Sequence, residues 1–530
     1  MASKHHETRT GGRDATKAVI PGRFALSVGN PELRCPEGWS WTRLTDVARL
    51  ETGHTPSRRH SEYWDGDIPW VGIKDATSNH GTVILDTHQH ATKLGIYNSS
   101  ARILPAGTVC LSRTASVGYV VIMGRPMATS QDFVNWVCSD AIDYRYLASI
   151  LVAEYSSYAL FSRGTTHQTI YFPEVKAFHA LLPPIEEQRR IADIIWSLTE
   201  KIQLNHQINQ TLEQIAQAIF KSWYVDFDPV KAKIAAKARW LALQPTAESA
   251  SPVCYAGEAE TLPDLETYMN LAAMQAISGK DEEALACLQQ EQPEQYAELW
   301  ETAELFPSAM QDGELGEIPE GWAARDLKSV TTEIRRGISP KYIEDGGVQV
   351  INQKCIRNHK IDFVLARRND SSKRKTDGRE IQIGDVLVNS TGVGTLGRLA
   401  PVRLLPERSV ADSHVTVIRA NDRLISKAFL AGLMLANEPF IEASGAGSTG
   451  QTELRKQVLE DIMFAMPSLE LSRAYEKVVS PMGRQMACLQ EQLTSLATTR
   501  DSILPKLLSG ELSVSAAEDQ VAEAAEPANV

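Results

Sequence analysis

The chain has 530 residues, with 54 Lys and Arg against 66 Asp and Glu, so its formal net charge is −12 at pH 7. This length is too great for one hydrophobic core and predicts roughly two to four domains. The acidic balance argues at first against a nucleic-acid binder, which usually carries a basic surface.

Other classes of protein are disfavoured by simple patterns. No run of about 18 apolar residues could form a transmembrane helix, and the first 30 residues lack the apolar stretch of a secretory signal. The seven cysteines are scattered and never spaced CxxC, so neither a structural zinc nor a disulfide framework is expected. We therefore expect a cytoplasmic chain with no membrane partner and no metal.

The first third of the chain is predicted to be a mixed α/β (α+β) globular domain behind a flexible N-terminal extension. We expect the extension to cover residues 1–33 and the domain to cover 34–182. Short β-branched runs bounded by turn residues indicate strands at 68–71, 108–111, 119–122 and 133–137. A helical patch follows at 143–160.

The segment 183–228 is predicted to be one long amphipathic helix. Pro183-Pro184 opens it, and Glu186 and Glu187 lie near its N-terminus, where negative charge favours the helix dipole. A polar residue on such a helix's seam fixes the register at some cost in stability. Residues spaced seven apart form a coiled-coil row of Ile191, Leu198, Asn205, Leu212 and Ile219, with Ile194, Ile208 and Ile215 beside it.

An internal repeat relates the second half of the chain to the first. Pro36-Glu37-Gly38-Trp39 recurs 283 residues later as Pro319-Glu320-Gly321-Trp322. The Gly164-Thr165-Thr166 turn recurs at the same offset as Gly447-Ser448-Thr449. We therefore predict a second α/β domain over 317–466 and a second long helix over 467–512, because repeated units fold alike.

The second long helix carries a heptad row that matches the first. Its members are Tyr475, Met482, Leu489, Leu496 and Ile503, with Val478, Leu493 and Leu507 beside them. Two such helices of about 35–40 residues span roughly 50–60 Å and favour antiparallel pairing, which relates the domains by a pseudo-twofold axis. The alternative is that each helix packs only on its own domain.

Two acidic segments flank the second copy. Residues 229–316 are predicted to be a helical linker, and the stretch 241–320 holds 17 Asp and Glu but one Lys. Residues 513–530 are acidic with few apolar side chains and are predicted to be a disordered tail.

Catalytic signatures are missing from the sequence. There is no phosphate-binding GxxxxGK[ST] loop, no HExxH zinc motif and no GxSxG nucleophile elbow. Residues 392–397 match GxGxxG, but they lie among turn-rich strands without the helix that a dinucleotide fold needs. No Asn-Pro-Pro-Tyr or Asp-Pro-Pro-Tyr tetrapeptide of an amino-methyltransferase is present. We expect no catalytic residue and no cofactor of this chain's own.

Polar and basic residues at comparable places in the two copies are candidates for DNA contacts, because such side chains bond base edges and phosphates. In the first copy they are Arg58, Arg59, Trp70, Lys74, Arg113, Thr114, Thr166 and His167. In the second copy they are Arg335, Arg336, Lys341, Asn352, Lys354, Ser390, Thr391 and Thr449. Each has a structural alternative: turn chemistry for Ser and Thr, core packing for Trp70, and a solvated surface position for the others.

Several longer segments are specific enough to identify a family. They are Leu-Pro-Pro-Ile-Glu-Glu-Gln-Arg-Arg-Ile-Ala at 182–192, Phe-Lys-Ser-Trp-Tyr-Val-Asp-Phe-Asp-Pro at 220–229 and Leu-Pro-Lys-Leu-Leu-Ser-Gly-Glu-Leu at 504–512. With the repeated PEGW starts, the chain resembles the specificity (S) subunits of type I restriction-modification systems over about 34–512. The second helix start, Pro467-Ser468-Leu469-Glu470, departs from the Pro-Pro-Ile-Glu-Glu-Gln wording.

The resemblance implies a DNA-recognition subunit that is not an enzyme by itself. Each domain would read one half of an interrupted site in double-stranded DNA. The paired helices would separate the readers and dock two methyltransferase (M) subunits, which restriction (R) subunits join. S-adenosylmethionine, ATP and Mg would belong to these partners. The alternatives are a specificity-like subunit of another phage-defence complex and a coiled-coil scaffold without DNA specificity.

The acidic charge is concentrated outside the predicted domains. The stretch 241–320 carries −16 and the stretch 511–530 carries −5, which leaves +9 for the rest of the chain. Residues 321–380 alone hold 14 Lys and Arg against 8 Asp and Glu. The composition therefore permits DNA recognition and argues against tight DNA binding by this chain alone.

Overall fold

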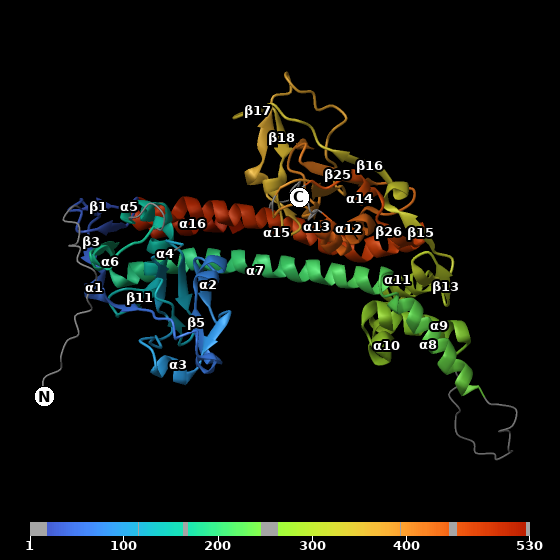
Figure 1. Cartoon of the computed structure of the whole chain (residues 1–530), viewed down its shortest axis with the longest axis horizontal. Helices are drawn as coiled ribbons and strands as arrows, with labels where there is room; N and C mark the ends of the chain where they lie inside the picture. The colour runs from blue at the N-terminus through green and yellow to red at the C-terminus, as the bar shows by residue number, and fades with distance from the viewer. Residues whose placement is uncertain are drawn as a thin grey trace, which may run out of the picture. The chain divides into compact units, whose positions relative to one another are not determined.

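The computed structural model describes residues 19–114, 116–162, 168–244, 263–392, 394–444 and 453–525. The chain divides into two compact units, Met1–His206 with Gln490–Val530, and Gln207–Leu489. Each unit contains one sheet-rich domain and parts of both long helices, α7 (Ile185–Tyr224) and α15 (Leu469–Ser509), as the labels in Figure 1 show. The mixture of two sheet-rich domains and two long helices is the predicted fold class.

The domain of the first unit is built on three sheets within its described residues. The central sheet has the order β4 (Ala48–Thr52), β11 (Phe133–Cys138), β8 (Val109–Ser112), β9 (Val120–Met123) and β6 (Thr82–Ile84). A second sheet contains β10 (Ala128–Thr129), β5 (Trp64–Val71) and β7 (Gln89–Ala91). The third contains β1 (Ile20–Pro21), β2 (Leu26–Val28), β12 (Phe178–Leu182) and β3 (Ser40–Arg43). Helix α4 (Tyr144–Ala153) packs on the central sheet through buried apolar residues.

The domain of the second unit has a comparable arrangement. One sheet contains β16 (Thr331–Arg336), β25 (Val415–Ala420), β22 (Val386–Asn389) and β23 (Leu399–Pro401). Another contains β17 (Tyr342–Ile343), β21 (Arg367–Asn369), β18 (Val348–Ile351) and β24 (Ser409–Ala411). Two-stranded pairs are β15 (Ala323–Asp326) with β26 (Met463–Met466) and β19 (Ile356–Arg357) with β20 (Lys360–Ile361). Helix α12 (Lys427–Ala436) takes the place of α4.

The strand pairings repeat between the two domains. Thr129 of β10 lies parallel to Val71 of β5, and Ala411 of β24 lies parallel to Ile351 of β18. In both domains the strand that follows this parallel strand, β11 or β25, runs antiparallel to an earlier strand of the central sheet, β8 or β22. These strands are almost wholly buried, which explains their continuous β-branched and apolar sequences. The predicted internal repeat is therefore also a repeat of the fold.

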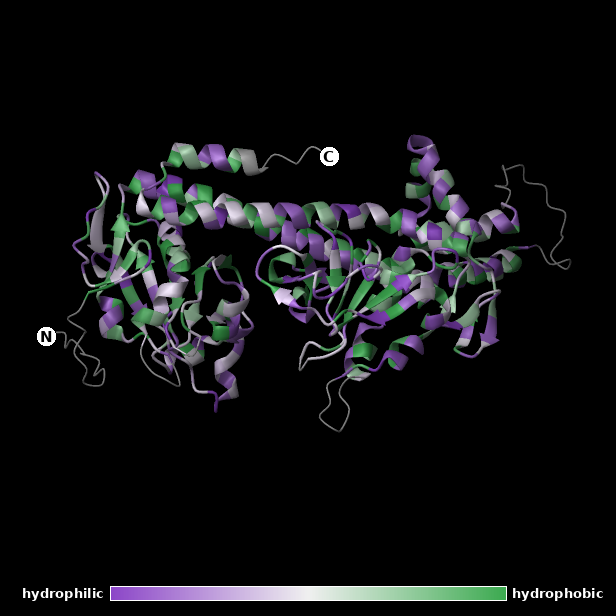
Figure 2. Cartoon of the chain, turned by 90° about the horizontal axis from the view of Figure 1, so that it is seen from above, coloured by the Kyte–Doolittle hydropathy of each residue, from purple (hydrophilic) through white to green (hydrophobic). Residues whose placement is uncertain are grey.

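The two long helices pack antiparallel inside each unit (Figure 1). In the first unit, Ile191 and Leu198 near the start of α7 share a buried cluster with Leu496 and Ile503 near the end of α15. In the second unit the end of α7 meets the start of α15, where the Tyr224 hydroxyl donates to the Leu471 carbonyl at 3.1 Å. Figure 2 shows hydrophobic and hydrophilic residues alternating along these helices, as expected for helices that bury one stripe.

The residues of the predicted seam differ in burial. Ile191, Leu198, Asn205, Leu489, Leu496 and Ile503 are buried, whereas Leu212, Ile219 and Met482 are half-buried. Ile215 and Val478 are 41% and 38% exposed, so their assignment beside the seam was wrong. A straight α-helix drifts about 20° for each heptad, so a row of strict seven-residue spacing leaves the contact face. Val479, next to Val478, is buried instead.

The described parts of the two predicted terminal segments, 19–33 and 513–525, contain regular structure. Within the expected flexible extension, residues 20–28 form strands β1 and β2, and the buried Glu154 carboxylate accepts hydrogen bonds from the backbone N–H groups of Arg23, Phe24 and Ala25 at 2.6–2.8 Å. Within the expected disordered tail, α16 (Val514–Ala525) buries Val514 and Ala517. A few apolar side chains on one face were enough to order it, although mean composition predicted disorder.

The described parts of the acidic linker contain four helices and one hairpin. Its elements are α8 (Asp228–Leu243), α9 (Leu265–Ser278), α10 (Glu282–Glu291), α11 (Pro293–Glu304) and the hairpin β13 (Met310–Gly313) with β14 (Gly316–Pro319). The buried Lys233 ammonium donates to the Phe306 carbonyl at 2.7 Å, and burial lowers the pKa of Lys233 to about 8. In the described ranges, no helix combines the length and the apolar character needed to span a bilayer.

Candidate nucleic-acid interface

The two domains present polar side chains at the same structural position, where the paired strands of each domain end. In the first domain the Ser130 N–H donates to the Val71 carbonyl at 3.0 Å. In the second domain the Asp412 N–H donates to the Ile351 carbonyl at 2.9 Å. Each of these bonds fixes the start of a three-residue connection to the next strand. The connection is residues 130–132 in the first domain and residues 412–414 in the second.

The first strand-end cluster consists of Thr114, Ser130 and Asp132. The Thr114 hydroxyl donates to Oδ1 of Asp132 at 2.8 Å, and the Ser130 hydroxyl donates to Oδ2 at 3.0 Å. Asp132 is half-buried, and its neighbour Gln131 is exposed. Each carboxylate oxygen has a further lone pair, so the cluster can accept a hydrogen bond from an outside group.

The second strand-end cluster consists of Gln353, Thr391, Asp412 and His414. Oγ1 of Thr391 lies 2.8 Å from Nδ1 of His414 and donates to Oε1 of Gln353 at 3.2 Å. The His414 backbone N–H donates to Oδ1 of Asp412 at 3.0 Å, which orients the residue. His414 is exposed, so its Nε2 can bond a group outside the chain.

The two clusters therefore share geometry and differ in chemistry. Thr391 corresponds to Thr114, and His414 corresponds to Asp132, because each pair joins the end of one central strand to the start of the next. A carboxylate suits a base amino group and repels phosphate, whereas an imidazole can donate or accept. Sequence reasoning found the two threonines and missed Asp132 and His414, although both precede a strand in the repeat.

Five of the predicted basic residues are exposed. Lys74 and Lys354 each lie three residues beyond the end of the matched strands β5 and β18. The Arg58 guanidinium lies 4.7 Å from the ring of Trp64 and donates to Oε1 of Gln89 at 3.0 Å, which holds it over the sheet. Arg59 and Lys341 are exposed as well. These charges can reach phosphates, so their assignment stays a prediction.

Three predicted contact residues belong to the interior instead. Trp70 is 4% exposed and its indole N–H donates to the His54 carbonyl at 3.1 Å, so it cannot stack on a base. Asn352 is 9% exposed and donates to the Leu365 carbonyl at 3.2 Å. Ser390 is fully buried, with its hydroxyl 2.6 Å from that of Thr416. Each satisfies protein groups that the strands would otherwise leave unpaired.

Arg113 is held in a half-buried position beside the first strand-end cluster. Its guanidinium lies 4.5 Å from the ring of Phe172 and donates to the Gln131 carbonyl at 3.2 Å. Burial lowers the pKa of Arg113, although the nearby Asp132 opposes this shift. The buried Nε of Arg113 has no protein partner among the described residues. Arg113 therefore lies beside the first strand-end cluster, and its Nε–H has no acceptor among the described residues.

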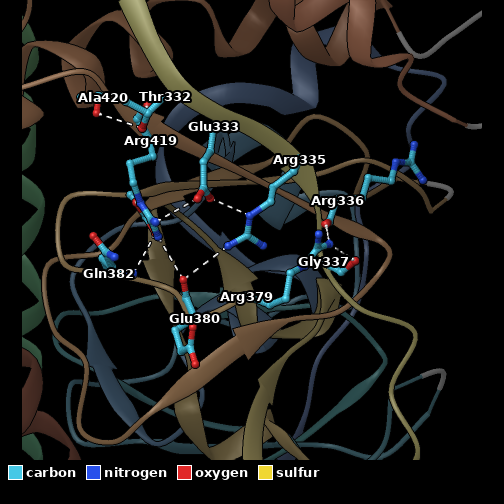
Figure 3. A network of polar contacts seen from close by, with 11 residues as sticks. Thr332, Glu333, Arg335, Arg336, Gly337, Arg379, Glu380, Gln382, Arg419 and Ala420 are labelled. Atoms are coloured by element: carbon cyan, nitrogen blue, oxygen red, sulfur yellow. Dashed lines mark hydrogen bonds and ion pairs between the residues drawn. The ribbon is translucent and has the colours of Figure 1, made fainter. Parts of the chain in front are cut away.

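Arg335 and Arg336 belong to a network of ion pairs and carbonyl contacts, shown in Figure 3. Nε of Arg335 donates to Glu333 at 2.6 Å, and Arg336 pairs with Glu453 at 2.9 Å. Arg379 donates to the Arg336 carbonyl at 2.6 Å, and burial together with the nearby Arg335 lowers the pKa of Arg379. The charge of Arg335 is therefore largely matched inside the domain, so it is a poor phosphate contact.

A second exposed basic segment was not predicted. Lys373, Arg374 and Lys375 are exposed in a turn, and the buried Asn369 donates to the Arg374 carbonyl at 2.9 Å. The run Lys-Arg-Lys was visible in the sequence, but a short basic run is more often a solvated surface. The predicted residues Thr166, His167 and Thr449 lie outside the described residues.

Comparison with known proteins gives a consistent result. A model of the type I restriction modification DNA specificity domain matches residues 36–214. The HindI type I restriction enzyme specificity subunit of Haemophilus influenzae is 32% identical over 381 residues, covering 69% of this chain and 76% of that protein. The MjaIX specificity subunit of Methanocaldococcus jannaschii is 24% identical over 492 residues, covering 91% and 95%. A crystal structure of a type I S subunit from M. genitalium aligns with 90% of this chain and 98% of its own at a TM-score of 0.49 and 13% identity.

Proposed function

Because this chain belongs to the specificity subunits of type I restriction enzymes, we propose that it reads a DNA site made of two half-sites, one for each sheet-rich domain. The observation that carries this proposal is the pair of matched strand-end clusters. Asp132 in the first and His414 in the second occupy one position with different hydrogen-bonding chemistry. Two copies of one fold with different contact groups are expected to recognise two different half-sites.

The antiparallel long helices supply a spacer for such a reader. An α-helix rises 1.5 Å for each residue, so its length would set the distance between the two reading domains. That distance would not depend on the base sequence between the half-sites. Two readers joined by a stiff element prefer half-sites at one distance and one rotational phase. The repeat and the helices together therefore support bipartite recognition.

We further infer that the chain acts in a complex and is not an enzyme by itself. Methyltransferase subunits would bind S-adenosylmethionine and methylate adenine in the recognised site, and restriction subunits would use ATP and Mg to cleave unmodified DNA. The described residues hold no group of three His, Cys, Asp or Glu side chains arranged for a metal. The two domains carry little net positive charge, with 13 Lys and Arg against 13 Asp and Glu over 34–182 and 22 against 19 over 317–466. This small charge supports a shared grip, in which partners supply part of the phosphate contact.

Methylome sequencing tests the proposal directly. The chain is expressed with its methyltransferase subunit in a host that lacks adenine methylation of its own. The expected result is methylated adenine in a single motif of two half-sites with a fixed number of intervening base pairs. Methylation without sequence preference would show a scaffold, and a continuous motif would contradict reading by two domains.

A further inference from the structure

A two-residue turn in the second domain reaches the spacer helix α7. Asn358 and His359 link β19 to β20, whose Arg357 and Lys360 are directly paired. Both turn residues have positive φ, 48° and 58°, the conformation of a type I′ hairpin turn. This tight turn holds the His359 ring in one direction.

His359 joins three elements of the second unit. Its Nε2 lies 2.6 Å from Oε2 of Glu438 at the start of α13 (Glu438–Ser444), and its Nδ1 lies 3.5 Å from Nε2 of Gln217 and 3.8 Å from Oε1 of Glu213 on α7. Arg403 completes the group, because it pairs with Oε2 of Glu213 at 2.8 Å and donates to the His359 carbonyl at 3.3 Å. We name these five residues the helix–domain cluster.

The helix–domain cluster is shielded from water. The side chains of Glu213 and Glu438 are 14% and 17% exposed, and those of Arg403 and His359 are 22% and 27% exposed. Charged hydrogen bonds in such a place are stronger and more directional than those on an open surface. The contact is therefore able to resist rotation of the domain against α7.

The first domain has an Asn-His pair at the matching place in a different backbone conformation, because Asn79 ends the helix α2 (Ile73–Ser78) with a φ of −126° and neither Asn79 nor His80 has a positive φ. Asn79-His80 corresponds to Asn358-His359 in the repeat, and Nδ1 of His80 accepts the Val120 N–H at 3.1 Å within its own domain. Burial and the charge of Arg500 on α15 lower the pKa of His80. Within the part of the chain that the structure describes, His80 makes no ion pair with a carboxylate. Of these two histidines, His359 therefore takes part in a polar contact with α7, whereas His80 is bonded within its own domain.

The second domain has another attachment to the helices, at the start of α15. The Ser426 N–H donates to the Ser472 hydroxyl at 2.8 Å, and the Ser426 hydroxyl donates to the Ser472 carbonyl at 2.9 Å. Phe220 and Tyr224 of α7 also pack on Phe429 of α12 through apolar ring contacts, which tolerate small changes of angle. The helix–domain cluster adds directional charged hydrogen bonds to α7, which restrict the orientation of the domain further.

We propose that the helix–domain cluster is a positioning device that fixes the angle of the second reading domain on its spacer helix and so restricts the number of base pairs accepted between the half-sites. This inference rests on the proposed bipartite recognition. Its residues are positioning residues, since they act on the spacer and do not contact bases. Disturbing them is expected to broaden spacer choice while both half-site sequences stay the same.

The test compares His359→Asn and Glu213→Gln with the control His80→Asn, each in complex with the methyltransferase subunit. Asparagine tolerates the positive φ of the turn, and glutamine keeps the volume of Glu213. Methylation is measured on a DNA library with the wild-type half-sites and spacers of n−1, n and n+1 base pairs. The two cluster variants are expected to raise methylation of the n−1 and n+1 sites, relative to n, by at least about fivefold, and His80→Asn to leave the ratio unchanged.

Each outcome has a definite meaning. Unchanged spacer ratios in both cluster variants, or an altered half-site sequence, would overturn the positioning role while the wild-type motif still supported bipartite reading. A wild-type complex without a bipartite motif would instead refute the proposed function. If one variant loses its circular dichroism signal, Glu438→Gln replaces it, because it removes the negative charge that pairs with His359 and leaves α7 unchanged.

Discussion

Asp132 and His414 occupy the same position at the start of matched strands in the two domains, each within 2.8 Å of a threonine hydroxyl from the neighbouring strand end. One copy of the fold thus presents a carboxylate where the other presents an imidazole. The threonine partner is common to both, so it fixes the geometry, whereas the exchanged residue changes the chemistry. This relationship makes the two residues the most direct probes of half-site choice.

Asp132→Asn is expected to change the first half-site alone. The amide keeps the shape but replaces one acceptor with a donor, so discrimination at the contacted base should fall by about 1–3 kcal/mol, roughly 10–100-fold. Methylome sequencing of the variant complex should show a relaxed position in one half and an intact second half. His414→Asn serves as the matched variant, with the effect in the other half. Relaxation of both halves by either substitution would contradict separate reading.

Glu154→Gln is expected to loosen the N-terminal strands. The buried carboxylate accepts backbone N–H groups from Arg23, Phe24 and Ala25, and a glutamine would turn an amide donor toward some of them. Leaving such groups unpaired costs about 2–3 kcal/mol. Urea unfolding and amide hydrogen exchange over residues 20–28 measure the effect. Glu186→Gln is the control, since Glu186 is 77% exposed and should change stability little.

Asn209→Leu is expected to stabilise the long helices. Asn209 is 1% exposed, and neither its Oδ1 nor its Nδ2 has a hydrogen-bond partner among the described residues. Replacing an unpaired buried amide by an apolar side chain should raise the free energy of unfolding by about 1–2 kcal/mol. Asn205→Leu is the comparison. It removes the 3.2 Å hydrogen bond from Asn205 to Gln492, so it should raise the free energy of unfolding by less than Asn209→Leu does. Equal gains would show that this bond contributes nothing.

The features that could be predicted from the sequence are those that depend on residues close together along the chain. The repeat, the helices and their pairing followed from local periodicity, which a single sequence displays directly. The order of β1 and β2 depends on Glu154, about 130 residues away, and no local pattern reports such a contact. Residue type alone could not separate a buried Trp70 from an exposed Arg58, because burial depends on which strand faces are covered. Asp132 and His414 became visible only when the fold aligned the two copies.

The pH dependence of stability is expected to have opposite signs at the two matched histidines. The hydrogen bond to Glu438 raises the pKa of His359 above its ordinary value of about 6.5, and burial opposes the shift. Glu213 also favours the protonated ring, and the positive charge of Arg403 disfavours it. The neighbouring Lys360, whose pKa burial lowers, adds a further charge near Glu213.

A raised folded-state pKa gives stability that is complete below the unfolded value and is lost as pH rises through the folded value. The stability difference between the wild type and His359→Asn should therefore shrink from pH 6 to pH 8. His80 has a lowered pKa, so its neutral form is favoured by folding, and the wild type should lose stability relative to His80→Asn as pH falls below about 6.5. Urea unfolding of the three proteins at several pH values measures both slopes. Parallel slopes for the two variants would contradict the different charge environments of the two histidines.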